Sequence, residues 1–285
     1  MSDGSRLQPD AAVPDGRSAT IEVRVMEVGG ALLNVATKRG DPSRRPLLLF
    51  NGIGANWQLA KPFLDALTTT PAIIFDMPGI GASPLPSHPY RPSTIARLTA
   101  RLVADLGHGE VDVAGVSWGG GMAQEFALGF PEMCKRLILA ATSPGSIMVP
   151  GNPLIMLRML TPRRYLDKAY MSKIAPELYG GAFRSDPTLI ARHARAMHGA
   201  SGMGYLYQLL AMTGWTSLPW LPSLRQPTLI LMGRDDPLVP VANGKILARL
   251  IPNSRLEIVD DGHLFIVTRA AETARRIESF LADES

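Results

Sequence analysis

The sequence has little of what disulfide-rich and membrane-spanning proteins need. Cys134 is the one cysteine among 285 residues, which excludes a disulfide within the chain. No apolar run reaches the roughly 18 residues of a transmembrane helix, so we expect a protein that does not span a membrane. The first 19 residues lack the apolar centre of a signal peptide and are rich in Pro, Gly, Ser and Asp. We therefore expect a flexible tail over residues 1–20 and a cytoplasmic location.

The net charge is also modest, and the excess of positive charge lies in one segment. The net charge is +4, but residues 146–222 hold 8 Lys or Arg against 3 Asp or Glu. Such an excess is typical of a solvated helical surface, and it would also favour contact with an anionic or polar interface. No nucleic-acid motif accompanies it, so we expect no nucleic-acid partner.

Short apolar runs alternate with helix-like stretches along the chain. Two early runs, Ile21–Val28 and Ala31–Thr37, predict strands joined by a Gly-Gly turn. Six further runs have the character of parallel strands buried on both faces: Pro46–Phe50, Ala72–Phe75, Val111–Val116, Arg136–Ala140, Thr228–Met232 and Leu256–Val259. Helices are expected between most of them: Gln58–Leu67, Thr94–Leu106, Gly119–Leu128, Ala242–Leu250 and Ala270–Leu281. This alternation predicts an α/β fold with a mostly parallel, doubly wound sheet.

One long interval breaks this rhythm. The run that ends at Ala140 is followed by the next buried run only at Thr228, and a structureless loop of that length is implausible. Helix-like stretches such as Leu189–Met197 predict an inserted helical lid over residues 146–222, with the core formed by 21–145 and 223–285. The lid holds 7 of the 13 Met and 5 of the 6 Tyr, which favours either ordinary packing or an adaptable apolar binding face.

A G-x-S-x-G motif, GVSWG at residues 115–119, lies between a predicted strand and a predicted helix. This order is typical of the nucleophile elbow of α/β hydrolases. The turn is tight, so glycine fits both places two residues from the serine. The helix N-terminus would stabilise negative charge that develops nearby. We predict that Ser117 is a nucleophile.

A serine nucleophile needs a general base, and the chain has only five histidines. His263 follows the last predicted strand and should lie at the same edge of the sheet as Ser117. His193 and His198 fall in the lid and could approach the site from above. His108 precedes the strand of the nucleophile, and His88 lies in a proline-rich loop. We predict that His263 is the base.

The acid that orients this histidine should precede it in the chain. Asp235 and Asp236 both follow the run Thr228–Met232, and the G-x-x-D spacing favours Asp236. Asp235 would then be a turn or capping residue. The segment ATSPG after Arg136–Ala140 contains no acid, which excludes a placement one strand earlier. The role of Asp236 would be to fix the tautomer of the base and to stabilise its charged form.

Acyl transfer also needs two N–H donors for the oxyanion. We predict the backbone N–H of Trp118 and that of Ile53, which lies in the glycine-containing loop after Pro46–Phe50. Asn51 can hold this loop by side-chain hydrogen bonds. Three further tryptophans are expected to join Trp118 in one apolar acyl pocket: Trp57, Trp215 and Trp220.

Taken together, these residues resemble the intracellular medium-chain-length poly(3-hydroxyalkanoate) depolymerases of the α/β-hydrolase superfamily. The resemblance extends from about Pro46 to Leu281 and is carried by the strings LLLFNGIGAN, GVSWGG, MVPG, TPRRY, APELYGGAFRSDP, GWTS, QPTLILMGRDDPLVP and DDGHLFIVTRA. It implies a triad of Ser117, Asp236 and His263. It also implies a polyester substrate and a location at the surface of storage granules. Polymer synthases share the fold but carry cysteine where this chain has Ser117.

This reading predicts an acyl-enzyme mechanism that releases 3-hydroxyacyl monomers or oligomers and needs no metal or organic cofactor. Three alternatives stay open from the residues. One is an esterase or lipase for small esters, and another is a hydrolase of carbon–carbon bonds with the same triad. The third is a granule-surface or ligand-binding protein whose triad is idle.

Overall fold

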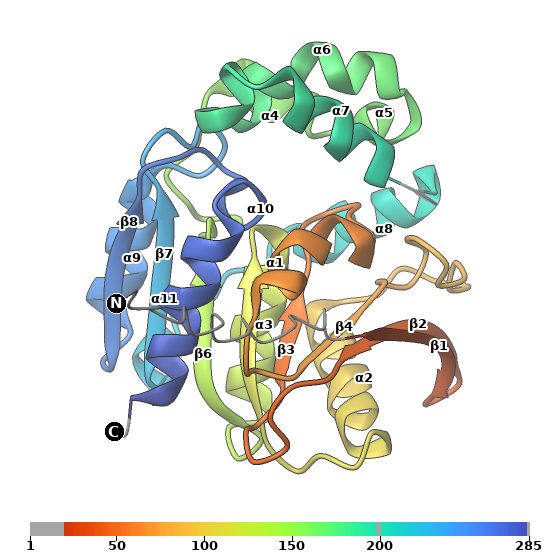
Figure 1. The fold of residues 1–285 in the computed structure, drawn as a ribbon, viewed down its shortest axis with the longest axis vertical. Coiled ribbons are helices and arrows are strands. Elements are labelled where there is room, and N and C mark those ends of the chain that lie inside the picture. Colours follow the sequence, from red (N-terminus) through yellow and green to blue (C-terminus); the bar gives the residue numbers. More distant parts are fainter. Residues whose placement is uncertain (1–19, 198–200, 284–285) are drawn as a thin grey trace, which may run out of the picture.

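An eight-stranded sheet forms the centre of the molecule, in the order β1-β2-β4-β3-β5-β6-β7-β8 (Figure 1). The computed structural model describes residues 20–197 and 201–283, so the predicted tail lies outside them except for Thr20. The strands are β1 (Ile21–Val28), β2 (Ala31–Lys38), β3 (Leu47–Phe50), β4 (Ala72–Phe75), β5 (Val111–Val116), β6 (Cys134–Ala140), β7 (Thr228–Gly233) and β8 (Ser254–Val259). Each coincides with a predicted run to within two residues.

Strand direction divides the sheet into two parts. β1 pairs with β2 and β2 with β4 in antiparallel fashion, whereas all the pairs from β4 to β8 are parallel. Gly29 and Gly30 have φ of 55° and 85°, which lets the chain reverse between β1 and β2. The six parallel strands end at one edge, and this edge carries the residues that the motifs singled out.

The prediction that all six parallel strands are buried on both faces is wrong for β8. This strand is last in the sheet, and of its six residues only Val259 is buried. An edge strand has a neighbour on one side only, so water reaches side chains that a central strand would cover.

Helices cover both faces of the sheet, as a doubly wound fold requires. Alternating residues of β3 illustrate this arrangement, because Leu48 and Phe50 join one hydrophobic core while Leu47 and Leu49 join the other. The first core includes α2 (Pro92–Asp105), α3 (Trp118–Gly129) and α9 (Val241–Leu250). The second includes α1 (Lys61–Ala66), α10 (Phe265–Thr268) and α11 (Ala270–Ala282).

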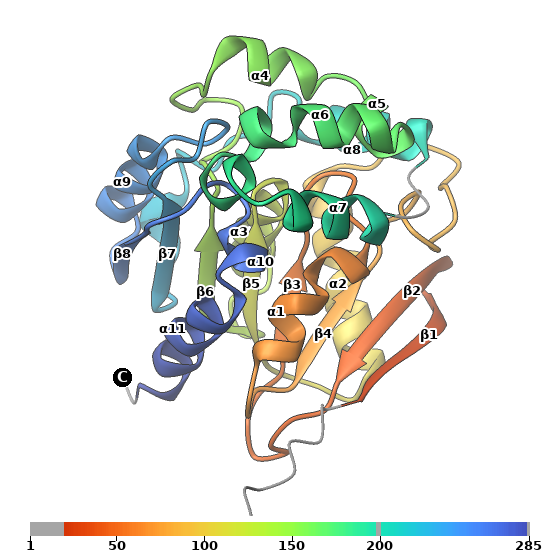
Figure 2. The same ribbon diagram turned by 45° about the horizontal axis from the view of Figure 1, so that its top comes forward.

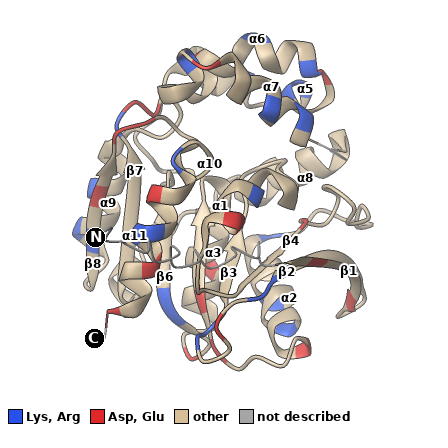
Figure 3. Ribbon diagram, viewed as in Figure 1, with Lys and Arg blue, Asp and Glu red and all other residues tan. Residues whose placement is uncertain are grey.

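A further group of helices lies between β6 and β7 and covers the carboxyl edge of the sheet (Figures 1 and 2). They are α4 (Pro153–Arg158), α5 (Arg163–Leu166), α6 (Lys168–Tyr179), α7 (Pro187–Ala196) and α8 (Gly202–Met212), with the short 3-10 helices η2 (Gly181–Arg184) and η3 (Leu221–Ser223). We keep the term lid for residues 146–222. Lys and Arg residues are frequent along α5, α6 and α7 (Figure 3). Within the described ranges, no helix is both long enough and apolar enough to cross a membrane.

Candidate active site

Ser117 lies in the turn between β5 and α3, in a backbone conformation that few non-glycine residues adopt. Its φ is 55° and its ψ is −120°. A conformation of this kind costs on the order of 1–3 kcal/mol, so the surroundings must hold it. The serine N–H donates to the carbonyl of Ala140, 2.9 Å away, and its carbonyl accepts from the Thr142 hydroxyl at 2.7 Å. Both contacts come from the end of the neighbouring strand β6.

The glycines of the motif are needed for close backbone approach. A Cβ on Gly115 would lie 2.3 Å from the carbonyl oxygen of Gly119. A Cβ on Gly119 would lie 2.2 Å from the carbonyl oxygen of Phe50. The first contact lies within the turn and the second joins α3 to β3, so any side chain here would push the elbow apart.

His263 and Asp236 form a buried pair beside this elbow. Nδ1 of His263 lies 2.7 Å from Oδ2 of Asp236, and their side chains are 4% and 0% exposed. The other carboxylate oxygen, Oδ1, accepts the backbone N–H groups of Leu238 and Val239 at 2.8 and 2.9 Å. Asp236 is thereby fixed with one oxygen facing the imidazole, which is the arrangement that orients a catalytic histidine.

Asp235 has a different environment. Its carboxylate is half-exposed, pairs with Arg184 at 2.9 Å and accepts the N–H of Gly181 at 2.8 Å. These contacts hold the start of η2.

The lid contacts the histidine loop directly. The backbone N–H of His263 donates to the carbonyl of Tyr179, 2.7 Å away at the end of α6. The ring of Tyr179 lies parallel to that of His263, with centroids 6.4 Å apart. The lid therefore helps to place the histidine.

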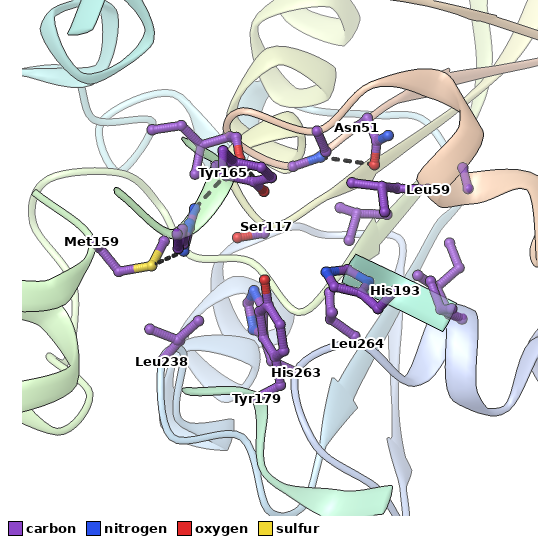
Figure 4. A pocket seen from close by; sticks show the side chains of 18 of the residues that line it. Asn51, Leu59, Ser117, Met159, Tyr165, Tyr179, His193, Leu238, His263 and Leu264 are labelled. Carbon is purple, nitrogen blue, oxygen red and sulfur yellow. Dashed lines mark hydrogen bonds between the residues drawn. The ribbon is translucent and has the colours of Figure 1, made fainter. Parts of the chain in front are cut away.

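Ser117 and His263 line the same cavity, a small space of about 50 Å³ beneath the lid. Figure 4 shows Ser117, His263, His193 and Tyr165 arranged around it. Asn51 and Ile53, from the loop after β3, line it as well. The cavity has room for a few water-sized groups.

A second cavity of about 230 Å³ adjoins the first and shares Ser117, Ile53, Met159 and Leu238 with it. Its other lining is mainly apolar and comes largely from the lid, including Met148, Met156, Leu160, Leu209 and Met212. Ser117 thus lies between a small space, into which Arg164 and His193 bring polar groups, and a larger space rich in methionine. The sequence left open whether the methionine-rich lid serves ordinary packing or forms an apolar binding face. Methionines of the lid form part of the wall of the larger cavity.

The predicted oxyanion loop lies against the serine. A Cβ on Gly52 would be 3.9 Å from Cβ of Ser117, and Ile53 and Trp118 line the same cavity as Ser117. Asn51 holds this loop as expected, because its side chain donates to the Asn56 carbonyl at 2.9 Å and accepts the Gly52 N–H at 3.0 Å.

Two lid residues that the sequence analysis missed hold the peptide between Ile53 and Gly54. The Tyr165 hydroxyl donates to the Ile53 carbonyl at 2.7 Å, and the Gly54 N–H donates to Oε1 of Gln208 at 2.6 Å. The Trp118 indole N–H donates to the Gln208 carbonyl at 2.9 Å. The lid thus fixes both segments that carry the predicted oxyanion donors. Nothing in the sequence pattern marks Tyr165 or Gln208, since only the tertiary fold brings α5 and α8 to this loop.

Two further lid side chains, Arg164 and His193, bring buried polar groups to the small cavity. Arg164 is 2% exposed, and its Nε has no hydrogen-bond partner among the described residues. His193 is 7% exposed, and its Nε2 likewise lacks a partner in the described part of the chain. Burial, with a smaller contribution from the charge of Arg164, lowers the pKa of His193 to about 4. The histidine is therefore neutral near pH 7.

His193 was one of two lid histidines expected to be able to approach the site from above, and it lines the small cavity beside Ser117. His198 lies outside the described residues. Arg164 was missed, although it belongs to the string TPRRY in the lid.

The prediction that Trp57, Trp215 and Trp220 line the acyl pocket does not match their positions. None of the three lines either cavity that contains Ser117. Trp57 packs in the core beneath α1, and Trp215 and Trp220 contact each other beside Glu125, which accepts the Trp215 indole N–H at 2.9 Å. Met156 of α4 and Leu209 and Met212 of α8 line the larger cavity instead.

Other candidate chemistry finds no support in the structure. Cys134 is buried in the core, and this burial raises the pKa of its thiol. Gly81 packs against the carboxylate of Asp76, which accepts the N–H of Ala82 at 3.0 Å, so this glycine-containing loop is a structural turn. Over residues 20–197 and 201–283, no group of three or more His, Cys, Asp or Glu side chains could hold a metal ion.

Comparisons with known proteins agree with this geometry. Residues 45–270 match the model of the α/β-hydrolase fold family. A poly(3-hydroxyalkanoate) depolymerase of Ectopseudomonas oleovorans is 49% identical over 262 residues, which cover 92% of this chain and 93% of that protein. The 3-oxoadipate enol-lactonase 2 of Acinetobacter baylyi is 27% identical, with coverage of 87% and 92%. The crystal structure of the enol-lactonase from Burkholderia xenovorans LB400 has the same fold, with a TM-score of 0.79 at 20% identity and coverage of 91% and 100%. The chain therefore belongs to the α/β-hydrolase family and, within it, to the poly(3-hydroxyalkanoate) depolymerases, which are carboxylic ester hydrolases.

Proposed function

We propose that this enzyme is a serine hydrolase that cleaves the ester bonds of medium-chain-length poly(3-hydroxyalkanoate). The observation that carries the proposal is the strained Ser117 beside the His263–Asp236 pair, at the mouth of a methionine-rich cavity. An ester with a long alkyl branch would place the branch in the apolar cavity and its carbonyl at the serine. The likeness to the depolymerase of Ectopseudomonas oleovorans supports the same substrate class.

The chemistry would proceed through an acyl-enzyme. His263 takes the proton of Ser117 as the hydroxyl oxygen attacks the ester carbonyl, while Asp236 stabilises the imidazolium. The N–H groups of Ile53 and Trp118 would hold the oxyanion, at the positive end of α3. His263 then protonates the leaving hydroxyl, and water attacks the acyl-enzyme to release the acid.

Contact with a polymer granule would use the outer surface of the lid. Of the thirteen large apolar side chains that are exposed among the described residues, nine belong to the lid: Ile147, Val149, Leu154, Leu157, Leu160, Leu166, Met203, Leu206 and Leu210. Exposed apolar surface of this extent marks an interaction site. Most of these residues lie on or next to α4 and α8, the two helices that border the apolar cavity. A hydrophobic polyester surface fits this face, which opens toward the serine.

Turbidity clearance of purified polymer suspensions tests the proposal. One suspension would contain medium-chain polymer and the other short-chain polymer, with Ser117→Ala as the blank. We expect the wild-type enzyme to clear the medium-chain suspension and to release 3-hydroxy acids, while Ser117→Ala stays folded and clears neither. Turnover of a p-nitrophenyl ester without clearance of either polymer would contradict the substrate and favour a hydrolase of small esters. Hydrolysis by the Ser117→Ala variant would contradict the mechanism.

A further inference from the structure

Arg164 is a buried positive charge without a negative partner among residues 20–197 and 201–283. Its side chain lies against the rings of Tyr165 and Tyr205, with Cζ 4.8 and 5.6 Å from their centroids. Its polar contacts are the Met159 sulfur, from Nη1, the Ile53 carbonyl, 3.4 Å from Nη2, and the hydroxyl of Tyr165. Among the described residues it makes no ion pair, and Nε is left without an acceptor. Arginine stays protonated in proteins, so a charge remains in this cavity at any working pH.

Such a charge is costly unless an anion meets it. His193 reaches the same cavity with an Nε2 that no described residue hydrogen-bonds. It is neutral near pH 7, so it adds hydrogen-bonding capacity without a second charge. A guanidinium with an unused N–H beside a neutral imidazole fits a carboxylate, which takes several donors at two oxygens. The cavity also contains Ser117, so the carboxylate would belong to the substrate.

We infer that Arg164 and His193 form a subsite for the terminal carboxylate of a 3-hydroxyacyl chain, so that the enzyme removes units from the carboxyl end. This inference rests on the proposed function. Units inside the polyester are neutral, and only the end unit carries a carboxylate, two carbon atoms from the oxygen of the last ester bond. Arg164 and His193 would hold this carboxylate in the small cavity, while alkyl branches occupy the larger apolar cavity that shares Ser117 with it.

Each turnover would then release one monomer as the leaving group. Ser117 Oγ bonds to the acyl carbon of the last ester, and the bond from that carbon to the 3-oxygen of the end unit breaks. The serine proton passes through His263 to this oxygen, and the end unit departs as a free 3-hydroxy acid. Water supplies hydroxide to the acyl carbon and a proton to Ser117, which leaves a chain with a new terminal carboxylate.

Two matched dimers test the subsite. The first is the ester dimer of 3-hydroxyoctanoate with its free carboxylate, and the second carries a primary amide at that position. Both contain one ester bond, and they differ in charge but little in shape. We expect the wild-type enzyme to cleave the free acid with a kcat/KM roughly 10- to 100-fold higher, mainly through KM, because a charge-assisted hydrogen bond is lost in the amide. Equal values for the two dimers would overturn the inference.

Variants assign the preference to the residue. Arg164→Met keeps roughly the length of the side chain without the charge, and we expect it to abolish the preference, so that the kcat/KM values for the two dimers become about equal. Tyr165→Phe is the control, because it removes a contact to the same Ile53 carbonyl without a change of charge. It should retain the preference even if kcat falls for both dimers. An equal loss on both dimers in Arg164→Met would contradict the subsite and assign Arg164 to positioning of the Ile53 loop.

Circular dichroism establishes that the variants are folded, and the wild-type comparison stands if one of them is not. Turnover of p-nitrophenyl octanoate and clearance of polymer report on the proposed function separately. Active enzyme without a preference for the acid would refute the subsite alone, whereas absence of clearance would refute the polymer substrate.

Discussion

Replacement of Asp236 by asparagine tests the proposed triad most sharply, because the structure dictates how the new side chain must lie. Oδ1 of Asp236 accepts two backbone N–H groups, from Leu238 and Val239, and only an oxygen can take that place. In Asp236→Asn the amide NH₂ would therefore face Nδ1 of His263. A donor there forces Nδ1 to be the acceptor and places the imidazole proton on Nε2. In that tautomer the histidine cannot accept the proton of Ser117.

The magnitude follows from this tautomer and from the lost charge. The bond between His263 and Asp236 is 2.7 Å long and buried, so it is a strong charge-assisted contact in the imidazolium form. We expect kcat to fall by roughly 10³- to 10⁴-fold, equivalent to about 4–5.5 kcal/mol, as for the same exchange in other Ser-His-Asp enzymes. KM should change little, because the carboxylate does not line the small cavity.

Initial rates with p-nitrophenyl octanoate between pH 7 and 9 would measure this effect, with thermal unfolding as the check on folding. The matched control is Asp235→Asn, which changes the neighbouring carboxylate at the surface. Its pair with Arg184 is half-exposed, so we expect activity within about twofold of wild type. An Asp236→Asn enzyme within tenfold of wild type, or a larger loss in Asp235→Asn, would refute the assignment.

Three further changes test the elbow and the lid. Ser117→Gly and Ser117→Ala both remove the hydroxyl, but only glycine adopts a φ of 55° without strain. We therefore expect Ser117→Gly to have a free energy of unfolding in urea about 1 kcal/mol higher than that of Ser117→Ala. Equal values for the two variants would show that the turn is unstrained. Gly119→Ala places a Cβ 2.2 Å from the Phe50 carbonyl oxygen. We expect it to lower the free energy of unfolding by more than about 2 kcal/mol and to remove most of the activity. In Gly121→Ala the new Cβ would contact the flexible end of a methionine side chain, so the free energy of unfolding should fall less than in Gly119→Ala. A larger fall in Gly121→Ala would contradict the packing described. The pKa of His193 falls from an ordinary 6.5 to about 4 in the folded protein. Between these two pH values the unfolded chain binds a proton that the folded protein does not. The free energy of unfolding should therefore fall by up to about 3 kcal/mol as the pH drops from 6.5 to 4. His193→Gln should remove that part of the loss when urea unfolding at pH 7 and pH 4.5 is compared, and an unchanged pH dependence would show that His193 is not buried as a neutral group.

Patterns that are local in the sequence predicted most of the core. The parallel strands are recognisable because strands buried on both faces are mostly apolar. β3 and β4 are wholly apolar, and the polar residues of β5 to β7 are Asp112, Lys135, Arg136 and Thr228, at or near the start of each strand. The elbow is recognisable because its tight turn admits only glycine at two places beside Ser117. His263 and Asp236 follow from topology, since the carboxyl ends of parallel strands meet at one edge. Their contact at 2.7 Å agrees with that expectation.

The lid is where sequence reasoning failed. Its composition indicated an apolar surface. The prediction that Trp57, Trp215 and Trp220 line the acyl pocket was wrong, because it used only the presence of tryptophan in the sequence. Which side chains of an inserted helix face the site depends on how the helices pack on one another, and no periodicity within one helix encodes this. Arg164, Tyr165 and Gln208 look like ordinary lid residues in the sequence.

The sequence by itself determined the α/β-hydrolase fold and predicted that Ser117, His263 and Asp236 lie at one edge of the sheet, because each of these depends on contacts within a strand, a turn or one sheet edge. Only the tertiary structure decided that the lid holds the Ile53–Gly54 peptide and buries Arg164 and His193 above Ser117. These contacts join residues more than a hundred positions apart in several cases, such as Tyr165 with Ile53. Their free energy depends on distances and burial that exist only once the lid has packed onto the core.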